Sequence, residues 1–365
     1  MSFSAFDHAC MTRALRLARR GLYSTTPNPR VGCVLAQQGQ VVAEGWHLRA
    51  GEPHAEIHAL REAGAAAAGA TAYVTLEPCS HQGRTGPCAQ ALIDAGVGAV
   101  IVATRDPNPR VAGQGIAMLR AAGIETCEGL LSDEARALNV GFFSRMLRGR
   151  PWVRVKLAQS LDGRTALKDG SSAWITGTAA RQDVQRWRAR ACAVLTGLGT
   201  VQRDNPSLNV RLPQVQRQPL RVIADSRWQT PAAARTLHLP GATLVAGRAD
   251  VPVPAALEAV TECLPLASDG GRVDLAALLE ALADRELNEV HVEAGAGLAG
   301  ALLEARLMDE LLLYQAPVVL GSDALPTLAI KGPSQMQDRQ HFALEEQVMV
   351  GEDLRIRLRP QYCED

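Results

Sequence analysis

Two successive runs of alternating strand and helix patterns, separated by a short break, most constrain how this chain folds. Apolar β-type runs alternate with helix patterns on both sides of residues 147–151, which read Leu-Arg-Gly-Arg-Pro. Such alternation is typical of layered α/β domains, because strands joined by helices pair into a sheet whose faces the helices cover. Since 365 residues suffice for two ordinary domains, the break predicts one domain over residues 1–147 and another over residues 151–365.

The expected elements follow this alternation along the chain. In the first part, helices are predicted over residues 5–20, 54–68, 88–95, 115–122 and 132–146, and strands over 31–36, 41–46, 72–76, 97–104 and 124–128. In the second part, strands are predicted over residues 152–157, 193–196, 221–224, 243–246, 289–293, 311–316 and 355–359, and helices over 178–191, 275–285 and 300–307. Both parts therefore belong to the α/β class.

Composition excludes several classes of protein. The formal net charge is zero, so no global field attracts a polyanion, and we expect no nucleic-acid partner. The first twenty residues lack the apolar core of a secretory signal, and no run of eighteen apolar residues occurs, so we expect no membrane segment. Eight scattered cysteines do not form a disulfide framework. This cysteine pattern favours a reducing cytoplasm.

The densest group of reactive side chains lies in two segments of the first part. His54 and Glu56 occur as Pro-His-Ala-Glu at the start of a predicted helix, and Cys79 and Cys88 each follow a proline. Imidazole and thiolate are ligands that zinc prefers, and three of them leave a fourth position for a water whose pKa zinc lowers to about 7. In zinc deaminases a carboxylate beside the metal moves the protons, with the pattern H-x-E and P-C-x-x-C. The sequence therefore predicts a deaminase with zinc on His54, Cys79 and Cys88, and with Glu56 as the proton carrier.

Other interpretations of these residues stay open at this point. Eight residues separate the two cysteines, whereas the general deaminase pattern has two. The three side chains can be ordinary residues, or part of a closed structural zinc site whose fourth ligand is His47, His58 or His81. A closed site would leave Glu56 without a role. A non-catalytic zinc module and an RNA- or DNA-editing deaminase are further alternatives, and the aromatic content of 4% argues against the editing enzyme.

Three segments of the first part closely resemble one enzyme family. They read Thr-Pro-Asn-Pro-Arg-Val-Gly-Cys-Val at 26–34, Gly-Glu-Pro-His-Ala-Glu at 51–56 and Leu-Glu-Pro-Cys-Ser-His-Gln-Gly-Arg-Thr-Gly-Pro-Cys at 76–88. These segments resemble the bifunctional riboflavin-biosynthesis deaminase/reductases, in which the longer spacing between the cysteines is usual. Gly86 departs from the family, which more often has proline there, and this change leaves the ligands intact.

The resemblance implies a cytidine-deaminase-like three-layer fold for the first domain, with the zinc ligands and proton carrier already named. It also implies that Asn28 lies in the substrate pocket. His81 and Arg84 lie between the two cysteine ligands and are expected to meet the substrate phosphate.

The resemblance continues through the second part and so covers nearly the whole chain. It is carried by residues 155–164, 174–177, 181–184, 199–211 and 292–300, which follow in the order that the family has. It implies an NADPH-dependent reductase domain whose α/β fold is similar to that of dihydrofolate reductase.

The last of these segments also has a meaning of its own. Gly295, Gly297 and Gly300 form G-x-G-x-x-G between a predicted strand and a helix, a turn that brings backbone N–H groups to a pyrophosphate. Glycine-rich turns that bind nothing are common, so the motif alone leaves both possibilities open. The acidic residue that would end the next strand in an NAD-binding Rossmann domain is missing, because that strand ends in Gln315-Ala316-Pro317. The pattern therefore favours NADPH on a different α/β fold.

The resemblance further implies two sets of contacts in the second domain. The implied NADPH contacts are Ala158, Trp174, Thr200, Asp204, Ser226, Gly295, Ala296, Gly297, Leu298, Ala299, Gly300 and Ala301. The implied substrate contacts are Ser172, Arg188, Leu208, Arg211 and Glu293. The two arginines offer planar forks suited to phosphate, and the indole offers a face to nicotinamide. Taken singly, these side chains can equally be surface charges and a core aromatic.

Lys156, one of three lysines in the chain, lies on the strand that leads into the reductase site. We expect it to orient the ribose or to supply a proton as hydride arrives. By resemblance, the first domain removes the 2-amino group of 2,5-diamino-6-(5-phosphoribosylamino)pyrimidin-4-one, and the second reduces the ribose of the deaminated product. Family members commonly self-associate, so a homo-oligomer, dimer or tetramer, is expected by analogy.

Overall fold

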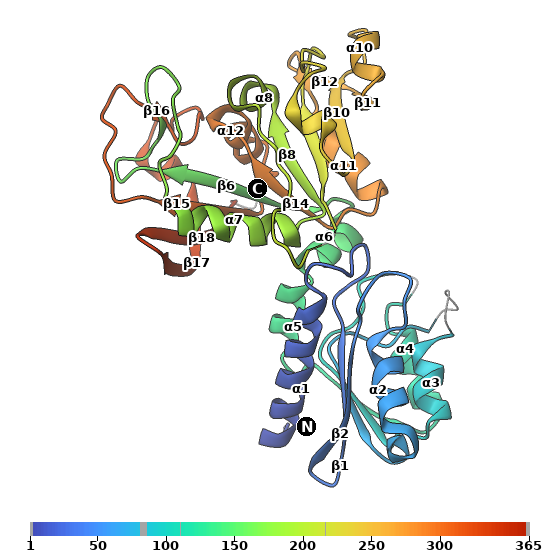
Figure 1. The fold of residues 1–365 in the computed structure, drawn as a ribbon. Helices are drawn as coiled ribbons and strands as arrows, with labels where there is room; N and C mark the ends of the chain where they lie inside the picture. The colour runs from blue at the N-terminus through green and yellow to red at the C-terminus, as the bar shows by residue number, and fades with distance from the viewer. Residues whose placement is uncertain (1–2, 81–85, 110, 216, 363–365) are drawn as a thin grey trace. The chain divides into compact units, whose positions relative to one another are not determined.

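The chain forms two compact units, Met1–Arg150 and Pro151–Asp365, each with its own sheet and apolar core. The structure is a computed structural model that describes residues 3–80, 86–109, 111–215 and 217–362, and Figure 1 colours them along the chain. Helix α6 (Val140–Arg148) ends the first unit at Gly149, whose φ of 67° is in the left-handed region that glycine tolerates. No helix of the described residues is long and apolar enough to cross a membrane.

The sheet of the first unit has the order β2-β1-β3-β4-β5. Its strands are β1 (Gly32–Gln37), β2 (Gln40–Trp46), β3 (Thr71–Val74), β4 (Ala99–Val102) and β5 (Glu125–Glu128). Strand β1 is antiparallel to β2 and β3, whereas β3, β4 and β5 are parallel. The turn between β1 and β2 is formed by Gln38 and Gly39, which have φ values of 52° and 74°. Two positive φ values match the turn type whose twist suits a two-residue hairpin.

Helices cover both faces of this sheet, which makes three layers (Figure 1). Along β1, Cys33 and Leu35 pack in the core with helices α2 (Ala55–Ala63), α3 (Cys88–Asp94) and α4 (Gln114–Ala121). Val34 and Ala36 point to the opposite face and pack with α1 (Ala5–Ala18) and α5 (Ser132–Leu138). The alternation follows from the period of two in a strand, so both faces of β1 are apolar and buried.

The helix predicted over residues 132–146 is interrupted. It divides into α5 and α6 at Asn139, whose buried side chain accepts a hydrogen bond from the Arg30 backbone N–H (2.8 Å) and donates one to the Arg30 carbonyl oxygen (2.9 Å). The Arg30 guanidinium also donates to the carbonyl of Leu138 (2.8 Å). These long-range bonds replace helix bonds at the break and hold the segment that contains Asn28.

The second unit is built on a nine-stranded sheet with the order β11-β10-β9-β8-β14-β6-β15-β18-β17. Its strands are β6 (Trp152–Gln159), β8 (Ala193–Gly197), β9 (Leu220–Ala224), β10 (Thr243–Arg248), β11 (Glu262–Leu266), β14 (Glu289–Glu293), β15 (Glu310–Gln315), β17 (His341–Val350) and β18 (Asp353–Gln361). All pairs from β11 to β15 are parallel, and β18 and β17 add an antiparallel hairpin. Strands β11 and β17 were not predicted.

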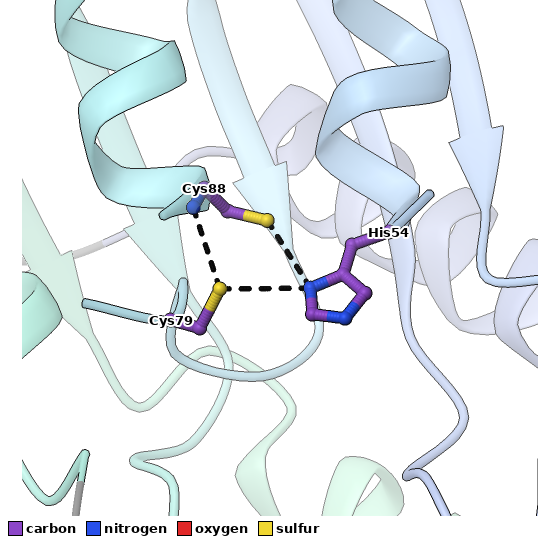
Figure 2. A group of neighbouring side chains, drawn as sticks. All are labelled: His54, Cys79 and Cys88. Carbon is purple, nitrogen blue, oxygen red and sulfur yellow. Dashed lines mark hydrogen bonds between the residues drawn. The ribbon is translucent and has the colours of Figure 1, made fainter. Parts of the chain in front are cut away.

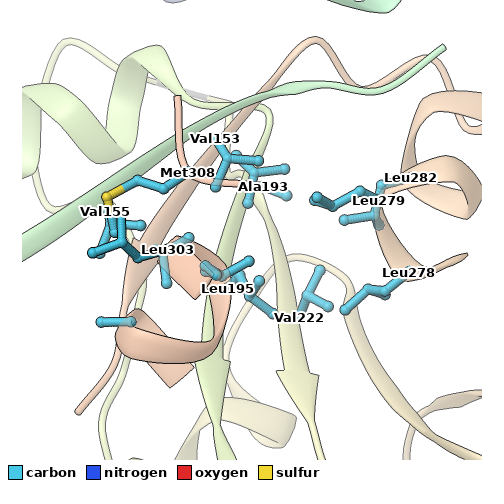
Figure 3. Close-up of a cluster of buried hydrophobic side chains, with 14 of the residues drawn as sticks. Val153, Val155, Ala193, Leu195, Val222, Leu278, Leu279, Leu282, Leu303 and Met308 are labelled. Atoms are coloured by element: carbon cyan, nitrogen blue, oxygen red, sulfur yellow. The ribbon is translucent and has the colours of Figure 1, made fainter. Parts of the chain in front are cut away.

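Helices α11 (Leu275–Asp284) and α12 (Ala296–Glu304) share an apolar core with one face of this sheet. Figure 3 shows part of this core, in which Val153, Leu195 and Val222 of three strands meet Leu279 and Leu303 of the helices. Helix α7 (Thr178–Arg190) packs with β15 in a separate cluster, and α8 (Leu198–Asp204) follows β8. Shorter elements are α9 (Arg235–His238), α10 (Ala255–Glu258), β7 (Arg164–Ala166), β12 (Ser268–Asp269), β13 (Arg272–Val273) and β16 (Leu325–Pro326).

A buried charge cluster crosses three central strands of the second unit. The Arg154 guanidinium on β6 donates to Glu289 on β14 (3.1 Å) and to Glu310 on β15 (3.0 Å), and its side chain is 1% exposed. Arg190 binds Glu289, and Arg357 binds Glu310. Burial alone would raise the pKa of Glu310, but Arg154 and the other arginines more than offset it and lower the pKa to about 2.

We predict that Glu310→Gln lowers the free energy of unfolding of the second unit by about 3 kcal/mol, because it leaves buried guanidinium charge without its partner. Tryptophan fluorescence during urea unfolding reports mainly on this unit, since four of the five tryptophans lie in it and Trp187 stacks 4.6 Å from the Arg154 guanidinium. Glu262→Gln is the control, because the Arg285–Glu262 pair is largely exposed and such pairs contribute about 1 kcal/mol or less.

The folded-state pKa of Glu310 lies below its ordinary value of 4.5, so its stabilisation is complete above that pH and is lost as the pH falls toward 2. The stability difference between wild type and Glu310→Gln should therefore shrink over this range. A difference that stays constant from pH 6 to pH 3 would contradict the assignment.

Candidate functional site: a three-ligand metal centre and a reductase cleft

The three predicted metal ligands come together in the first unit (Figure 2). Their ligand atoms lie within 4.8 Å of one another. His54 Nδ1 lies 3.2 Å from the Cys88 sulfur and 3.6 Å from the Cys79 sulfur. His54 is the residue before α2, Cys79 follows β3, and Cys88 is the first residue of α3.

The start of α3 holds the Cys79 loop. Pro87, the residue before this helix, provides no side-chain cap for the first backbone N–H groups. The N–H of Cys88 instead donates to the Cys79 sulfur (3.3 Å), and the N–H of Ala89 donates to the Cys79 carbonyl oxygen (3.1 Å). Unsatisfied N–H groups at a helix start favour partners with negative charge, so the position suits a thiolate.

Hydrogen bonding within the group separates the acidities of the two thiols. The bond from Cys88 lowers the pKa of Cys79 to about 4, and its bond to His54 acts in the same direction. The same bond to Cys79, together with burial, raises the pKa of Cys88. The bond to Cys79 raises the pKa of His54. The three side chains therefore interact through hydrogen bonds, and zinc binding would require loss of the proton from Cys88.

Glu56 lies in the first turn of α2, two residues after His54, and is 2% exposed. Its Oε2 atom is buried and has no hydrogen-bond partner. Burial raises its pKa to about 7, with the charge of His54 opposing the shift. A buried carboxyl group with a pKa near neutrality can both accept and release a proton at physiological pH.

The predicted substrate residue Asn28 is linked to this group through a histidine. Its amide nitrogen lies 3.1 Å from His47 Nε2, and the His47 ring packs edge-on against the His54 ring with centroids 5.1 Å apart. The other ring nitrogen of His47 lies 3.1 Å from the Pro53 carbonyl oxygen. His81 and Arg84 lie outside the described residues.

The donor set fits zinc. One imidazole and two thiols converge, a carboxylate with an unpaired buried oxygen lies beside them, and within the described ranges no fourth His, Cys, Asp or Glu joins the group. Structural zinc sites have four protein ligands, whereas catalytic sites have three and an open position. The geometry thus favours the catalytic alternative over the closed site with His47 or His58.

The second unit contains a cleft of about 1100 Å³ at the carboxyl ends of its parallel strands. Most of the residues predicted to bind NADPH or substrate line it: Lys156, Ala158, Ser172, Trp174, Arg188, Thr200, Asp204, Leu208, Arg211, Glu293, Gly295, Ala296, Gly297 and Leu298. Four predicted NADPH contacts do not line the cleft: Ser226, Ala299, Gly300 and Ala301. The Ser226 hydroxyl instead accepts a hydrogen bond from the Val273 N–H (3.0 Å).

The glycine-rich run is the start of helix α12, which begins at Ala296 and not at residue 300 as predicted. Gly295 is the residue before the helix, and a Cβ atom on Gly295 or Gly297 would meet no atom within 4 Å. A Cβ atom on Gly300 would lie 2.2 Å from the Ala329 carbonyl oxygen. The first two glycines therefore leave open space at a helix N-terminus, which suits a pyrophosphate, and the third permits close packing.

The planar fork of Arg188 binds Glu293 in this structure. Arg188 donates to both carboxylate oxygens of Glu293 and to the Asn209 carbonyl oxygen (3.0 Å), so the expected phosphate fork is occupied by a protein carboxylate. Burial alone would raise the pKa of Glu293, but Arg188 lowers it well below its ordinary value. Arg211 is exposed on the cleft and is the better placed of the two for a phosphate.

Trp174 and Lys156 line the same cleft with different surroundings. Trp174 is 76% exposed and stacks on the Arg181 guanidinium at 4.7 Å, so it is not a core aromatic. Lys156 pairs with Glu293 across strands β6 and β14, and its ammonium group lies 6.0 Å from the Tyr314 ring. Burial lowers the pKa of Lys156, while Glu293 opposes the shift.

Several residues near the two sites were not predicted from the sequence. Arg181, Arg203 and Arg235 line the cleft; Arg181 and Arg203 lie in segments that carry the family resemblance, whereas Arg235 had no signal. In the first unit, buried Glu77 precedes Cys79 by two residues and binds backbone N–H groups of distant segments. Its position in the Leu-Glu-Pro-Cys motif was the available signal.

The two units define a class: a zinc-dependent deaminase followed by a reductase. A family model described as the cytidine and deoxycytidylate deaminase zinc-binding region matches residues 4–104, and the RibD C-terminal domain matches residues 151–350. The Escherichia coli riboflavin biosynthesis protein RibD is 46% identical over 364 residues, covering 96% of this chain and 99% of the relative. The Haemophilus influenzae protein of the same name is 44% identical and covers 99% of both chains.

Solved structures give the same result. Acinetobacter baumannii RibD has a TM-score of 0.92 and 45% identity, covering 98% of this chain and 99% of that one. The Thermotoga maritima diaminohydroxyphosphoribosylaminopyrimidine deaminase/5-amino-6-(5-phosphoribosylamino)uracil reductase has a TM-score of 0.87 and 32% identity, with coverage of 98% and 99%.

The chain belongs to the RibD family of riboflavin-biosynthesis enzymes. It is a bifunctional deaminase and reductase with zinc and NADPH as cofactors, and it acts on a small molecule. The predicted fold class, a deaminase-like domain followed by a reductase domain, is confirmed.

Proposed function

We propose that the first unit hydrolyses the 2-amino group of 2,5-diamino-6-(5-phosphoribosylamino)pyrimidin-4-one, and that the second reduces the ribose of 5-amino-6-(5-phosphoribosylamino)uracil to ribityl. The Thermotoga maritima relative is named for both activities, as a deaminase and a reductase. The observation that supports the first step most directly is the convergence of one imidazole and two thiols beside the unpaired carboxyl oxygen of Glu56.

In this proposal His54, Cys79 and Cys88 hold zinc, which when bound acidifies water. Glu56 takes the proton from the attacking water and delivers it to the ring nitrogen and then to the leaving amine. Its burial supports this role, because a pKa near 7 balances acceptance against release of the proton. Asn28 binds the pyrimidine, since its amide is held beside the metal group by His47.

In the reductase cleft, NADPH is proposed to lie with its pyrophosphate at the N-terminus of α12, where Gly295 and Gly297 leave space. The indole face of Trp174 is available to the nicotinamide. The other proposed NADPH contacts on the cleft are Ala158, Thr200, Asp204, Ala296 and Leu298. Ser226, Ala299, Gly300 and Ala301 are also proposed NADPH contacts, although they are not among the residues that line this cleft.

The proposed substrate contacts in the reductase are Ser172, Leu208, Arg211 and the Arg188–Glu293 pair. Exposed Arg211 is suited to the phosphate. Arg188 fixes the Glu293 carboxylate, which can then accept hydrogen bonds from ribose hydroxyls. Lys156, opposite Glu293 on the neighbouring strand, is proposed to orient the ribose or to donate a proton as hydride arrives.

We predict that Glu56→Gln lowers the rate of ammonia release by at least about 100-fold, because glutamine cannot carry the proton. NADPH oxidation with the preformed deaminated intermediate should remain unchanged. Glu62→Gln on the exposed face of α2 is the control. A chelator should likewise stop ammonia release alone, and retention of deamination by Glu56→Gln would refute this role.

We predict the opposite selectivity for Lys156→Met. NADPH oxidation should fall by about 100-fold through loss of the charged donor, while ammonia release stays at the wild-type rate. Lys168→Met is the matched control, because the Lys168 side chain is 81% exposed. Equal loss of both activities would instead indicate a general defect and refute the role of Lys156.

We also infer a homo-oligomer, dimer or tetramer, in the reducing cytoplasm. Strand β17 forms an edge of the sheet, where Leu344 and Met349 are 61% and 60% exposed, and an unpaired edge with apolar side chains is suited to a second copy. The seven cysteines within the described ranges form no disulfide, which supports a reducing compartment. Sedimentation that shows only monomer at micromolar concentration would refute self-association.

A further inference from the structure

We propose that Glu77 is a positioning residue for the zinc site, whose buried carboxylate fixes the loop that carries Cys79. The inference rests on the proposed zinc site, and it concerns how one ligand is held and not the chemistry. Glu77 is 3% exposed and lies between the end of β3 and the ligand.

The Glu77 carboxylate gathers two distant segments of the first unit. It accepts four backbone N–H hydrogen bonds, from Asp106 (3.2 Å), Gly113 (2.9 Å), Gly115 (3.0 Å) and Ile116 (3.3 Å). Its own backbone N–H donates to the Thr104 carbonyl oxygen (3.0 Å). The residue is therefore held at its main chain and at both carboxylate oxygens.

These hydrogen bonds satisfy backbone N–H groups at the start of helix α4. The residue before this helix is Gly113, which has no side chain to cap the first turn. A carboxylate is well suited to the free N–H groups and the positive end of the helix dipole. The bonds in turn satisfy both oxygens of the buried Glu77 carboxylate, so the carboxylate and the helix end fix each other.

Helix α4, which Glu77 caps, also contacts Pro78, the residue next to the proposed ligand Cys79. A Cβ atom on Gly115 would lie 1.9 Å from the Pro78 carbonyl oxygen, so the backbone of Pro78 lies directly against the first turn of α4. Cys79 follows at once and is held from its other side by the N–H groups that open α3. The Cys79 loop is thus fixed between two helix starts.

Glu77→Gln keeps the size of the side chain but faces two of the backbone N–H groups with an amide NH₂, which cannot accept their hydrogen bonds. The loop should then hold Cys79 less firmly. Loss of a residue that orients a metal ligand typically costs 10- to 100-fold in metal affinity. We expect zinc to leave the variant about 10-fold faster or more.

The experiment uses the whole chain loaded with zinc and mixed with excess chromogenic chelator. Glu62→Gln is the matched control, because Glu62 also accepts a backbone N–H, from Glu44 (2.9 Å), but on the exposed side of α2. We expect fast zinc release from Glu77→Gln only, with NADPH oxidation unchanged as evidence that the second unit is intact. A release rate within twofold of wild type would overturn the proposal.

Thermal unfolding separates positioning from a merely structural role. If Glu77 positions Cys79, the rise in Tm of the first unit on adding zinc should be smaller in Glu77→Gln than in wild type. A structural role alone lowers Tm equally with and without zinc, and that result would overturn the proposal. Should Glu77→Gln fail to fold, Glu77→Asp, which keeps the charge but is shorter, must show the same smaller rise. A wild-type chain that binds no zinc would instead refute the proposed deaminase site itself.

Discussion

Parallel pairing of strands is the constraint on which both units depend. Neighbouring parallel strands need a crossover, usually a helix, so the carboxyl ends of the strands and the N-termini of the following helices gather at one edge. In the first unit this edge brings Cys79 after β3 next to Cys88 at the start of α3. In the second, Glu293 ends β14 and Gly295 precedes α12. Residues far apart in sequence therefore meet where backbone N–H groups are free.

Buried charged groups differ in how completely their polar atoms are paired. Arg154 has two carboxylate partners, although its Nε has no hydrogen-bond partner, and Glu77 has four backbone N–H partners, so the charge of each is compensated. Glu56 is buried with one carboxyl oxygen left unpaired. Such a group is costly to the fold unless it exchanges a proton or meets a ligand. This difference in charge compensation distinguishes Arg154 and Glu77 from Glu56, the proposed proton carrier.

Most of the helices and strands that we predicted were recognised from the local pattern of apolar and polar residues. Apolar residues at alternate positions identified β6 and β14, because successive side chains of a strand point to opposite faces of the sheet. Strand β17 was missed because its side chains are largely exposed and include Glu345 and Glu346. The break at Asn139 was missed because it depends on a residue 109 positions earlier. The periodicity of apolar residues does not reveal hydrogen-bond partners that are distant in the sequence.

The sites divide in the same way. The residue types and their order in the H-x-E and Pro-Cys motifs predicted that His54, Cys79 and Cys88 lie together, and these residues do converge. Motif spacing could not predict the hydrogen bonds of the Glu77 carboxylate, since the backbone N–H groups that it binds are 29 to 39 residues further along the chain. Nor could it show that Arg188 is occupied by Glu293, which is 105 residues away. The start of α12 was placed too late because glycine is a poor helix former, although a helix N-terminus tolerates it.

Removal from water acts on the two proton-transfer candidates in opposite directions. It raises the pKa of an acid and lowers that of a base, because it disfavours whichever form is charged. Glu56 is thereby raised to about 7, and the pKa of Lys156 is lowered from its usual alkaline value. Both pKa values therefore move toward neutrality, where a proton carrier is most effective. Glu293 opposes the shift of the Lys156 pKa, whereas one buried oxygen of Glu56 has no hydrogen-bond partner.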